Sequence, residues 1–397
     1  MVEVWLLECL KGIGRLFLHP MFYYLIGFTL LLGYFRVKRE RRAFHIRVFD
    51  ILHELRTLFP VGIVAGLVIS IITIAAGVVI PFGSIVLVAA ATFIISVTGK
   101  VRWLSPAYVM GLSFFAIILL SNLSFQHETL TRLLDDLKET GLPALAILLA
   151  MLMIVEGIFI LKNGHKGTSP DLFKSKRGQQ VGAHIAQRLW MVPIFLLVPG
   201  NAISTQFEWW PVFTVAGESY SLFLVPFGIG FFHRVKSALP IKTITLVGKR
   251  VILLGIIISG LSVASIWYPV ISIIAVSFAL VGRELISLQH RVTDDSQSFY
   301  FSKRKQGLLV LGVIPFSPAE KMAIQFGEVI TKVNGIPVNT VEEFYQSIQK
   351  NSAFCKLEVL DINNEIRFVQ RALYAGEHHE LGILFVDTDK KWNEQAV

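Results

Sequence analysis

The sequence has few cysteines and few charged residues, and it lacks the patterns that mark hydrolases and metalloenzymes. Its two cysteines, Cys9 and Cys355, lie at opposite ends of the chain, which excludes a disulfide framework and the paired spacing of a zinc site. His53-Glu54 begins like the zinc-binding H-E-x-x-H pattern, but position 57 is threonine, so the second imidazole is missing. No G-x-S-x-G motif for a nucleophilic serine occurs. The sequence therefore predicts no catalytic residue, no metal site and no cofactor.

Charge is scarce and unevenly distributed. Charged residues make up 16% of the chain and hydrophobic residues 54%, with a mean hydropathy of +0.62, which is far more apolar than a soluble domain of this length. Residues 1–306 carry 29 basic and 16 acidic side chains, whereas residues 307–397 carry 8 and 12. The positive residues are dispersed between apolar segments, so we expect membrane lipid and not nucleic acid as their partner.

Most of the chain consists of apolar stretches long enough to cross or nearly cross a bilayer. We expect six to nine helices, and the loops between them alternate in Lys and Arg content. This alternation predicts that the basic loops and the chain from Arg283 onward are cytoplasmic. The apolar stretches are 20–35, 59–79, 81–98, 103–121, 142–161, 189–206, 215–232, 251–267 and 268–282, and the main basic loops are 36–47, 162–188 and 233–250.

Four units follow from these patterns. Residues 1–18 place apolar side chains at helical spacing and predict an amphipathic helix at the membrane surface. A transmembrane domain is expected at 19–284, a polar linker at 285–306, and a small soluble domain at 307–397. Within the transmembrane domain, the outer loop 122–141 could form a short surface helix. The fold class is thus a polytopic α-helical membrane bundle followed by a small α+β domain.

The segment from Gly307 to Val338 carries a recognisable signature. A small-residue turn opens a short helix, because the fixed φ angle of proline suits a first helical turn. A glycine ends that helix before a β-branched run, and an Asn-Gly pair supplies the positive φ angles of a tight hairpin turn. The pattern resembles a bacterial PDZ domain, a β-sandwich or partly open barrel with two helices, except that Glu328 stands where the family usually has aspartate. The signature residues are Ser317, Pro318, Ala319, Gly327, Asn334 and Gly335.

After the signature, a second helix is predicted with an apolar face at i, i+3, i+4 and i+7. In PDZ domains this helix forms one wall of a peptide groove. A later stretch, Leu381-Gly382-Ile383, resembles the carboxylate-binding loop of these domains, although it falls at the end of the domain and would make the order permuted. The resemblance implies that a peptide adds to this strand edge; alternatively, 381–386 simply closes the sheet. The predicted groove residues are Val341, Phe344, Tyr345, Ile348, Leu381, Gly382, Ile383 and Leu384.

Glu156 is an acidic residue well inside an apolar run. A charge there is costly in lipid and is a functional hypothesis by default. Because it lies near the expected cytoplasmic end of its helix, we favour snorkelling or a hydrogen bond between helices over a role in transport.

Across its whole length the chain resembles the MinJ family of cell-division topological determinants. The resemblance rests on a multi-span part opening with LHPMFYYLIGF, basic cytoplasmic loops, and a single C-terminal PDZ-like domain. It implies a non-catalytic adaptor that recruits the division inhibitor MinD to poles and septa by bridging it to DivIVA, with other divisome membrane proteins as further candidate partners. Two alternatives stay open: a regulator or substrate adaptor of a separate membrane protease, and a transporter-like bundle with a regulatory domain. A small-molecule ligand is not expected.

Overall fold

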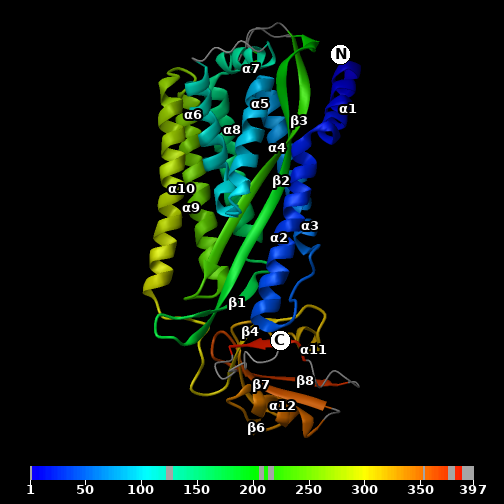
Figure 1. Ribbon diagram of the computed structural model, residues 1–397, viewed down its shortest axis with the longest axis vertical. Coiled ribbons are helices and arrows are strands. Elements are labelled where there is room, and N and C mark those ends of the chain that lie inside the picture. The colour runs from blue at the N-terminus through cyan, green and yellow to red at the C-terminus, as the bar shows by residue number, and fades with distance from the viewer. Residues whose placement is uncertain are drawn as a thin grey trace.

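Two regions of different character lie end to end in the protein (Figure 1). The computed structural model describes residues 2–121, 128–204, 210–212, 219–351, 354–373 and 381–386. We call residues 2–296 the apolar region and residues 297–386 the C-terminal region. The first is mostly helical and the second is built around a sheet. Helix α1 lies at the end of the apolar region that is farthest from the C-terminal sheet (Figure 1).

The apolar region contains five helical segments that are long and apolar enough to cross a membrane, counting α3 and α4 together, and the shorter apolar helices α5 and α6, all within the described residues. Helix α7 confirms the short helix predicted in 122–141. The bounds are α1 (Val2–Leu18), α2 (Pro20–Phe44), α3 (His53–Leu58), α4 (Pro60–Ala76), α5 (Phe82–Val97), η1 (Val101–Leu104), α6 (Pro106–Leu120), α7 (Glu128–Lys138), α8 (Leu142–Asn163), α9 (Pro240–Ala264) and α10 (Val270–Ser296).

Two of the predicted membrane helices are wrong. The described parts of these two stretches, 189–204 and 219–232, belong to long antiparallel strands, β2 (Gln180–Ser204) and β3 (Ser219–Val235). A short strand, β1 (Ser169–Lys174), pairs with the start of β2. We call the paired strands β2 and β3 the ribbon. Figure 1 shows that the ribbon runs along the helices through most of the length of the apolar region.

Prolines explain why these stretches are not helices. Pro193 and Pro226 lie directly opposite each other in the ribbon. In a helix, each would remove a backbone hydrogen bond and clash with the preceding turn, at a cost of about 3 kcal/mol or more. A long apolar run alone does not distinguish a buried strand from a buried helix, so the prolines were the informative signal.

Helix α4 lies against the free edge of β2 and satisfies its backbone. The amide of Phe195 donates to Ser70 Oγ at 2.8 Å, and Thr73 Oγ1 donates to the carbonyl oxygen of Phe195 at 3.0 Å. A Cβ atom at Gly62 or Gly66 would overlap carbonyl oxygens of β2. The small residues on this face of α4 therefore allow the close approach that pairs polar backbone groups in apolar surroundings.

Two stretches expected as a loop and a linker are partly helical. Helix α2 continues to Phe44 through most of 36–47, and α10 continues to Ser296 through the first half of 285–306. Both extensions lack proline and glycine, and their Lys, Arg, Glu and Leu residues favour helix. Both helices therefore extend toward the C-terminal region.

The C-terminal region is a sheet in the order β8-β7-β5-β4-β9, with β6 paired to β5. Its core is apolar and includes Phe344, which is fully buried. Within the described residues β9 is a terminal strand of the sheet, paired on one side with β4. The bounds are β4 (Leu308–Val313), α11 (Pro318–Lys321), β5 (Val329–Val333), β6 (Ile336–Pro337), α12 (Val341–Gln349), β7 (Phe354–Leu360), β8 (Ile366–Ala372) and β9 (Ile383–Phe385).

Candidate partner-binding groove

Ser317, Asn334 and Gly335 form the turns predicted for them, whereas Gly327 does not end the short helix, because α11 stops at Lys321. Ser317 is the N-cap of α11 and its Oγ accepts a hydrogen bond from the amide of Glu320 at 3.3 Å. Gly327, Asn334 and Gly335 all have positive φ angles, which glycine and asparagine adopt most readily. The short helix and the hairpin are thus fixed by the residue types that the sequence pattern identified.

The loop that resembles a carboxylate-binding loop is fastened to the signature turn. The carbonyl oxygen of Leu381 accepts from the amide of Ala319 at 3.0 Å, and that of Gly382 accepts from the amide of Ile314 at 2.8 Å. Gly382 has a φ of +79°, and a Cβ there would overlap Ser317. These hydrogen bonds therefore fix the position of the loop, which leads directly into β9.

The predicted groove residues separate into two sets. Val341 and Tyr345 on α12, together with Ile383 and Leu384 on β9, line one groove. The remaining side chains lie in the core: Phe344, Ile348 and Leu381 are fully buried. The Phe344 ring packs edge-on against Phe385 with centroids 5.1 Å apart, so it holds α12 against the strand and is not available to a ligand.

The opposite wall of this groove comes from the apolar region, which sequence reasoning did not predict. The end of α2 contributes Arg39, Arg42 and the residues up to Ile46, and β1 contributes Asp171. The groove has a volume of about 510 Å³, within the range of about 300–1,000 Å³ typical of ligand sites. Figure 1 shows the end of α2 reaching the C-terminal sheet. The groove is therefore a composite of both regions.

A buried charge cluster fixes the end of α2. Arg36 Nη1 and Arg188 Nη1 donate to the two carboxylate oxygens of Glu54, at 2.9 and 3.1 Å. One turn further along α2, Glu40 accepts hydrogen bonds from the Val48 amide at 2.8 Å and the Ser169 hydroxyl at 2.7 Å. Arg36 lies in a stretch read from the sequence as a basic loop, yet it is buried and paired. The cluster positions the helix turn that carries Arg39.

The two regions also meet at His184, which is buried on β2. Its Nε2 lies 2.8 Å from the carbonyl oxygen of Leu311 on β4, and its Nδ1 lies 2.9 Å from Thr168 Oγ1. Because a carbonyl can only accept, Nε2 carries the proton and Nδ1 accepts from threonine. The ring packs against Phe301 and Phe326. Burial lowers the pKa of His184 to about 4, so the ring is neutral at neutral pH.

Glu156 is fully buried between helices. Its carboxylate accepts from Arg283 Nη2 at 2.9 Å and from Ser105 Oγ at 2.7 Å, and both charged side chains are almost completely buried. The pair joins α8 to α10, with Ser105 at the start of α6. This geometry agrees with the expected link between helices and adds a charged partner, Arg283, that the sequence reading had assigned to the cytoplasmic tail.

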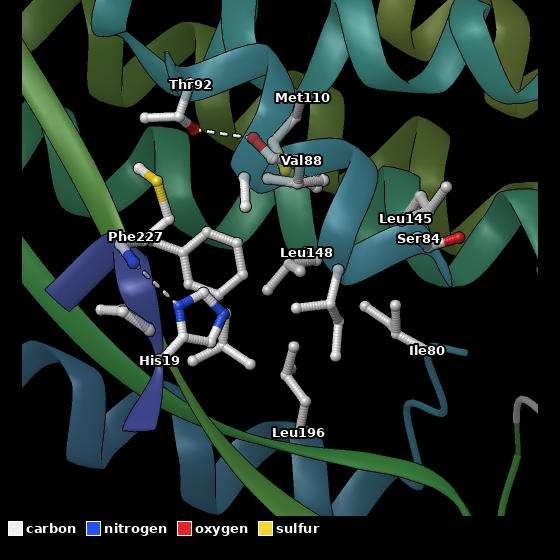
Figure 2. Close-up of a pocket in the computed structure, with 15 residues that line it drawn as sticks. His19, Ile80, Ser84, Val88, Thr92, Met110, Leu145, Leu148, Leu196 and Phe227 are labelled. Atoms are coloured by element: carbon white, nitrogen blue, oxygen red, sulfur yellow. Dashed lines mark hydrogen bonds between the residues drawn. The ribbon is translucent and has the colours of Figure 1, made fainter. Parts of the chain in front are cut away.

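A small cavity inside the bundle is not a ligand site. It lies between the ribbon, α5 and α8, beside His19, and its labelled neighbours are mostly apolar (Figure 2). Its volume is about 20 Å³, room for about one water molecule. In the described residues, no group of three or more His, Cys, Asp or Glu side chains could hold a metal ion.

Comparison with known proteins gives two informative relatives. The chain is 43% identical over 387 residues to the cell division topological determinant MinJ of Bacillus subtilis (strain 168), covering 98% of this chain and 97% of the relative. It is 25% identical over 377 residues to the probable cell division topological determinant MinJ of Lacticaseibacillus paracasei, covering 92% and 94%. No protein-family model matches the chain, so the PDZ assignment stays a prediction carried by the signature residues.

Proposed function

This chain belongs to the MinJ family of cell division topological determinants, and on that premise we propose that it is a non-catalytic membrane scaffold for placing the division site. The likeness over nearly the full length of both chains carries this proposal. The five long apolar helices support a multi-pass location in the cell membrane, with the C-terminal region in the cytoplasm and the protein concentrated at septa and poles.

The scaffold works by confinement. The apolar bundle restricts the C-terminal region to the plane of the membrane, which raises its effective concentration toward partners at the same surface. Contacts that are individually weak then suffice for recruitment. We propose that the partners are division-site proteins, with MinD held for delivery and DivIVA marking the site, and that the C-terminal region is a PDZ domain whose groove binds one of them.

Co-purification tests this function. The full chain is extracted from membranes with a mild detergent, and bound proteins are identified by mass spectrometry. We expect division-site proteins, and we expect Tyr345→Ala, in the groove wall, to reduce recovery of at least one. Gln349→Ala, exposed on the same helix, is the matched control and should leave recovery unchanged.

A second candidate is an adaptor for a separate membrane protease, which the same groove would serve by presenting substrates. The two functions separate in the same experiment. A protease recovered in place of division proteins would favour the adaptor and overturn the scaffold, whereas recovery of neither class would overturn both.

A further inference from the structure

Arg39 presents unused hydrogen-bond donors at the composite groove. Its Nε and Nη2 atoms are buried and have no hydrogen-bond partner among the described residues, although the side chain lines the groove. Two buried N–H groups of a guanidinium without partners are costly, and a carboxylate that reached them would relieve that cost by accepting two parallel hydrogen bonds. Arg39 is therefore placed to receive an anion.

The acidic residue already in the groove does not fill this role. Asp171 lines the groove and its negative charge partly offsets the positive charge of Arg39, but its Oδ2 accepts from Arg234 Nη2 at 2.7 Å and not from Arg39. Arg42 adds a second positive side chain to the same wall and is exposed. One wall of the groove thus carries two positive charges, and the carboxylate of Asp171 is already hydrogen-bonded to Arg234. This charge distribution favours a negatively charged ligand.

The other walls favour an extended polypeptide. Within the described residues, β9 has β4 on one side only, so its second edge can pair with an added strand. Val341, Tyr345 and Leu384 provide apolar contacts along that edge. Alternate side chains of an extended chain point to opposite sides, so such a chain can present apolar side chains to α12 and carboxylates to α2.

We propose that the composite groove binds an extended acidic segment of a partner protein, paired with the edge of β9 and held through its carboxylates by Arg39 and Arg42. This inference rests on the proposed function, because it names the chemistry of a partner that a scaffold would recruit. It assigns recognition to both regions jointly: the C-terminal region supplies the strand edge and the apolar pocket, and a membrane helix supplies selectivity for charge.

The test uses the full chain in nanodiscs of phosphatidylcholine, which carries no net charge. The probes are fluorescein-labelled ten-residue peptides of alternating valine with glutamate, glutamine or lysine. Fluorescence anisotropy measures their dissociation constants. We expect the glutamate peptide to bind at least about ten-fold more tightly than the glutamine peptide, as one charge-assisted contact of about 1.5–3 kcal/mol implies.

Substitutions locate the source of the charge preference. Arg39→Gln and Arg42→Gln should each bring the affinity for the glutamate peptide close to that for the glutamine peptide. Lys38→Gln and Arg41→Gln remove the same charge from exposed positions of α2 that do not line the groove, so they should have little effect. Because Arg42 is exposed, its replacement keeps the test valid if Arg39→Gln does not fold.

Three outcomes would overturn the inference. The first is equal affinity for the glutamate and glutamine peptides, and the second is an equal effect of control and groove substitutions. The third is that the arginine substitutions leave peptide binding unchanged but abolish binding to anionic lipid. The last is measured by exchanging phosphatidylcholine for phosphatidylglycerol, and it would assign the arginines to lipid headgroups. Peptide binding is measured without cellular partners. A failure of the proposed function in the co-purification experiment is therefore distinguishable from a failure here.

Discussion

The Nε2 atom of His184 donates to the carbonyl oxygen of Leu311 across the junction of the two regions, at 2.8 Å. Strand β2 and strand β4 are thereby joined through one neutral imidazole, although they lie far apart in the sequence. The composite groove exists only while this junction is closed, because α2 and β1 form one wall and the C-terminal region forms the other.

The junction should weaken in acid. Burial lowers the pKa of His184 to about 4, below its ordinary value of 6.5. The contribution of the neutral His184 ring to the stability of the junction is therefore fully present above pH 6.5. It is lost progressively as the pH falls toward about 4. Limited proteolysis between pH 7.5 and 4.5 should show increasing cleavage near the junction, whereas His184→Gln, which cannot be protonated, should lack this component. The same pH dependence in both proteins would contradict the assignment.

Breaking the buried pair of Glu156 and Arg283 should destabilise the bundle. Glu156→Gln leaves the guanidinium without its charge partner, and such changes cost about 3–5 kcal/mol. Thermal unfolding in detergent measures the loss. The double variant Glu156→Leu with Arg283→Leu removes both charges and should recover much of the stability. If the double variant were less stable than the single one, the pair would have a role other than joining helices.

Close packing of α4 on the ribbon should not tolerate an added methyl group. Gly66→Ala places a Cβ against the carbonyl of Pro193, and overpacking of this kind costs about 1–3 kcal/mol. The loss is read from the melting temperature in detergent. Gly260→Ala on α9 is the control, because nothing lies within 4 Å of its Cβ position. Equal effects of the two substitutions would show that α4 is not packed tightly on β2.

Cys355 should report unfolding of the C-terminal region. It is fully buried in the sheet core, and burial raises the pKa of its thiol to about 12, so the reactive thiolate is scarce at neutral pH. In a Cys9→Ser background, maleimide labelling should be slow in the folded protein and rapid in guanidinium chloride. Rapid labelling without denaturant would mean that strand β7 opens readily.

Local signals in the sequence were sufficient to predict the helices and turns of much of the C-terminal region. Thr340 and Glu343 form the capping box of α12, and the Asn334-Gly335 pair forms its turn with positive φ angles. Such features depend on neighbouring residues only. The helices of the apolar region were likewise found from runs of apolar residues, with ends displaced where α2 and α10 extend past their apolar segments.

The ribbon and half of the groove could not be obtained in this way. Apolar content gave β2 and β3 the pattern of buried helices, and the prolines Pro193, Pro199 and Pro226 argued against it. Arg39 was read as one of several basic loop residues, because its place beside β9 depends on a contact between distant segments. Val341 and Tyr345 were found from helical spacing, but the same spacing selected Phe344 and Ile348, which face the core.

The ribbon also constrains how the protein is made. Phe195 of β2 obtains its hydrogen bonds from Ser70 and Thr73 of α4, and an unpaired backbone group in hydrocarbon costs several kcal/mol. If the protein is inserted in the membrane as proposed above, the ribbon cannot enter the bilayer before α4 is present. The ribosome synthesises α4 well before β2, so the order of these segments along the chain matches the order in which they are needed. A circular permutant that begins with the ribbon would present the insertion machinery with strands lacking their covering helix.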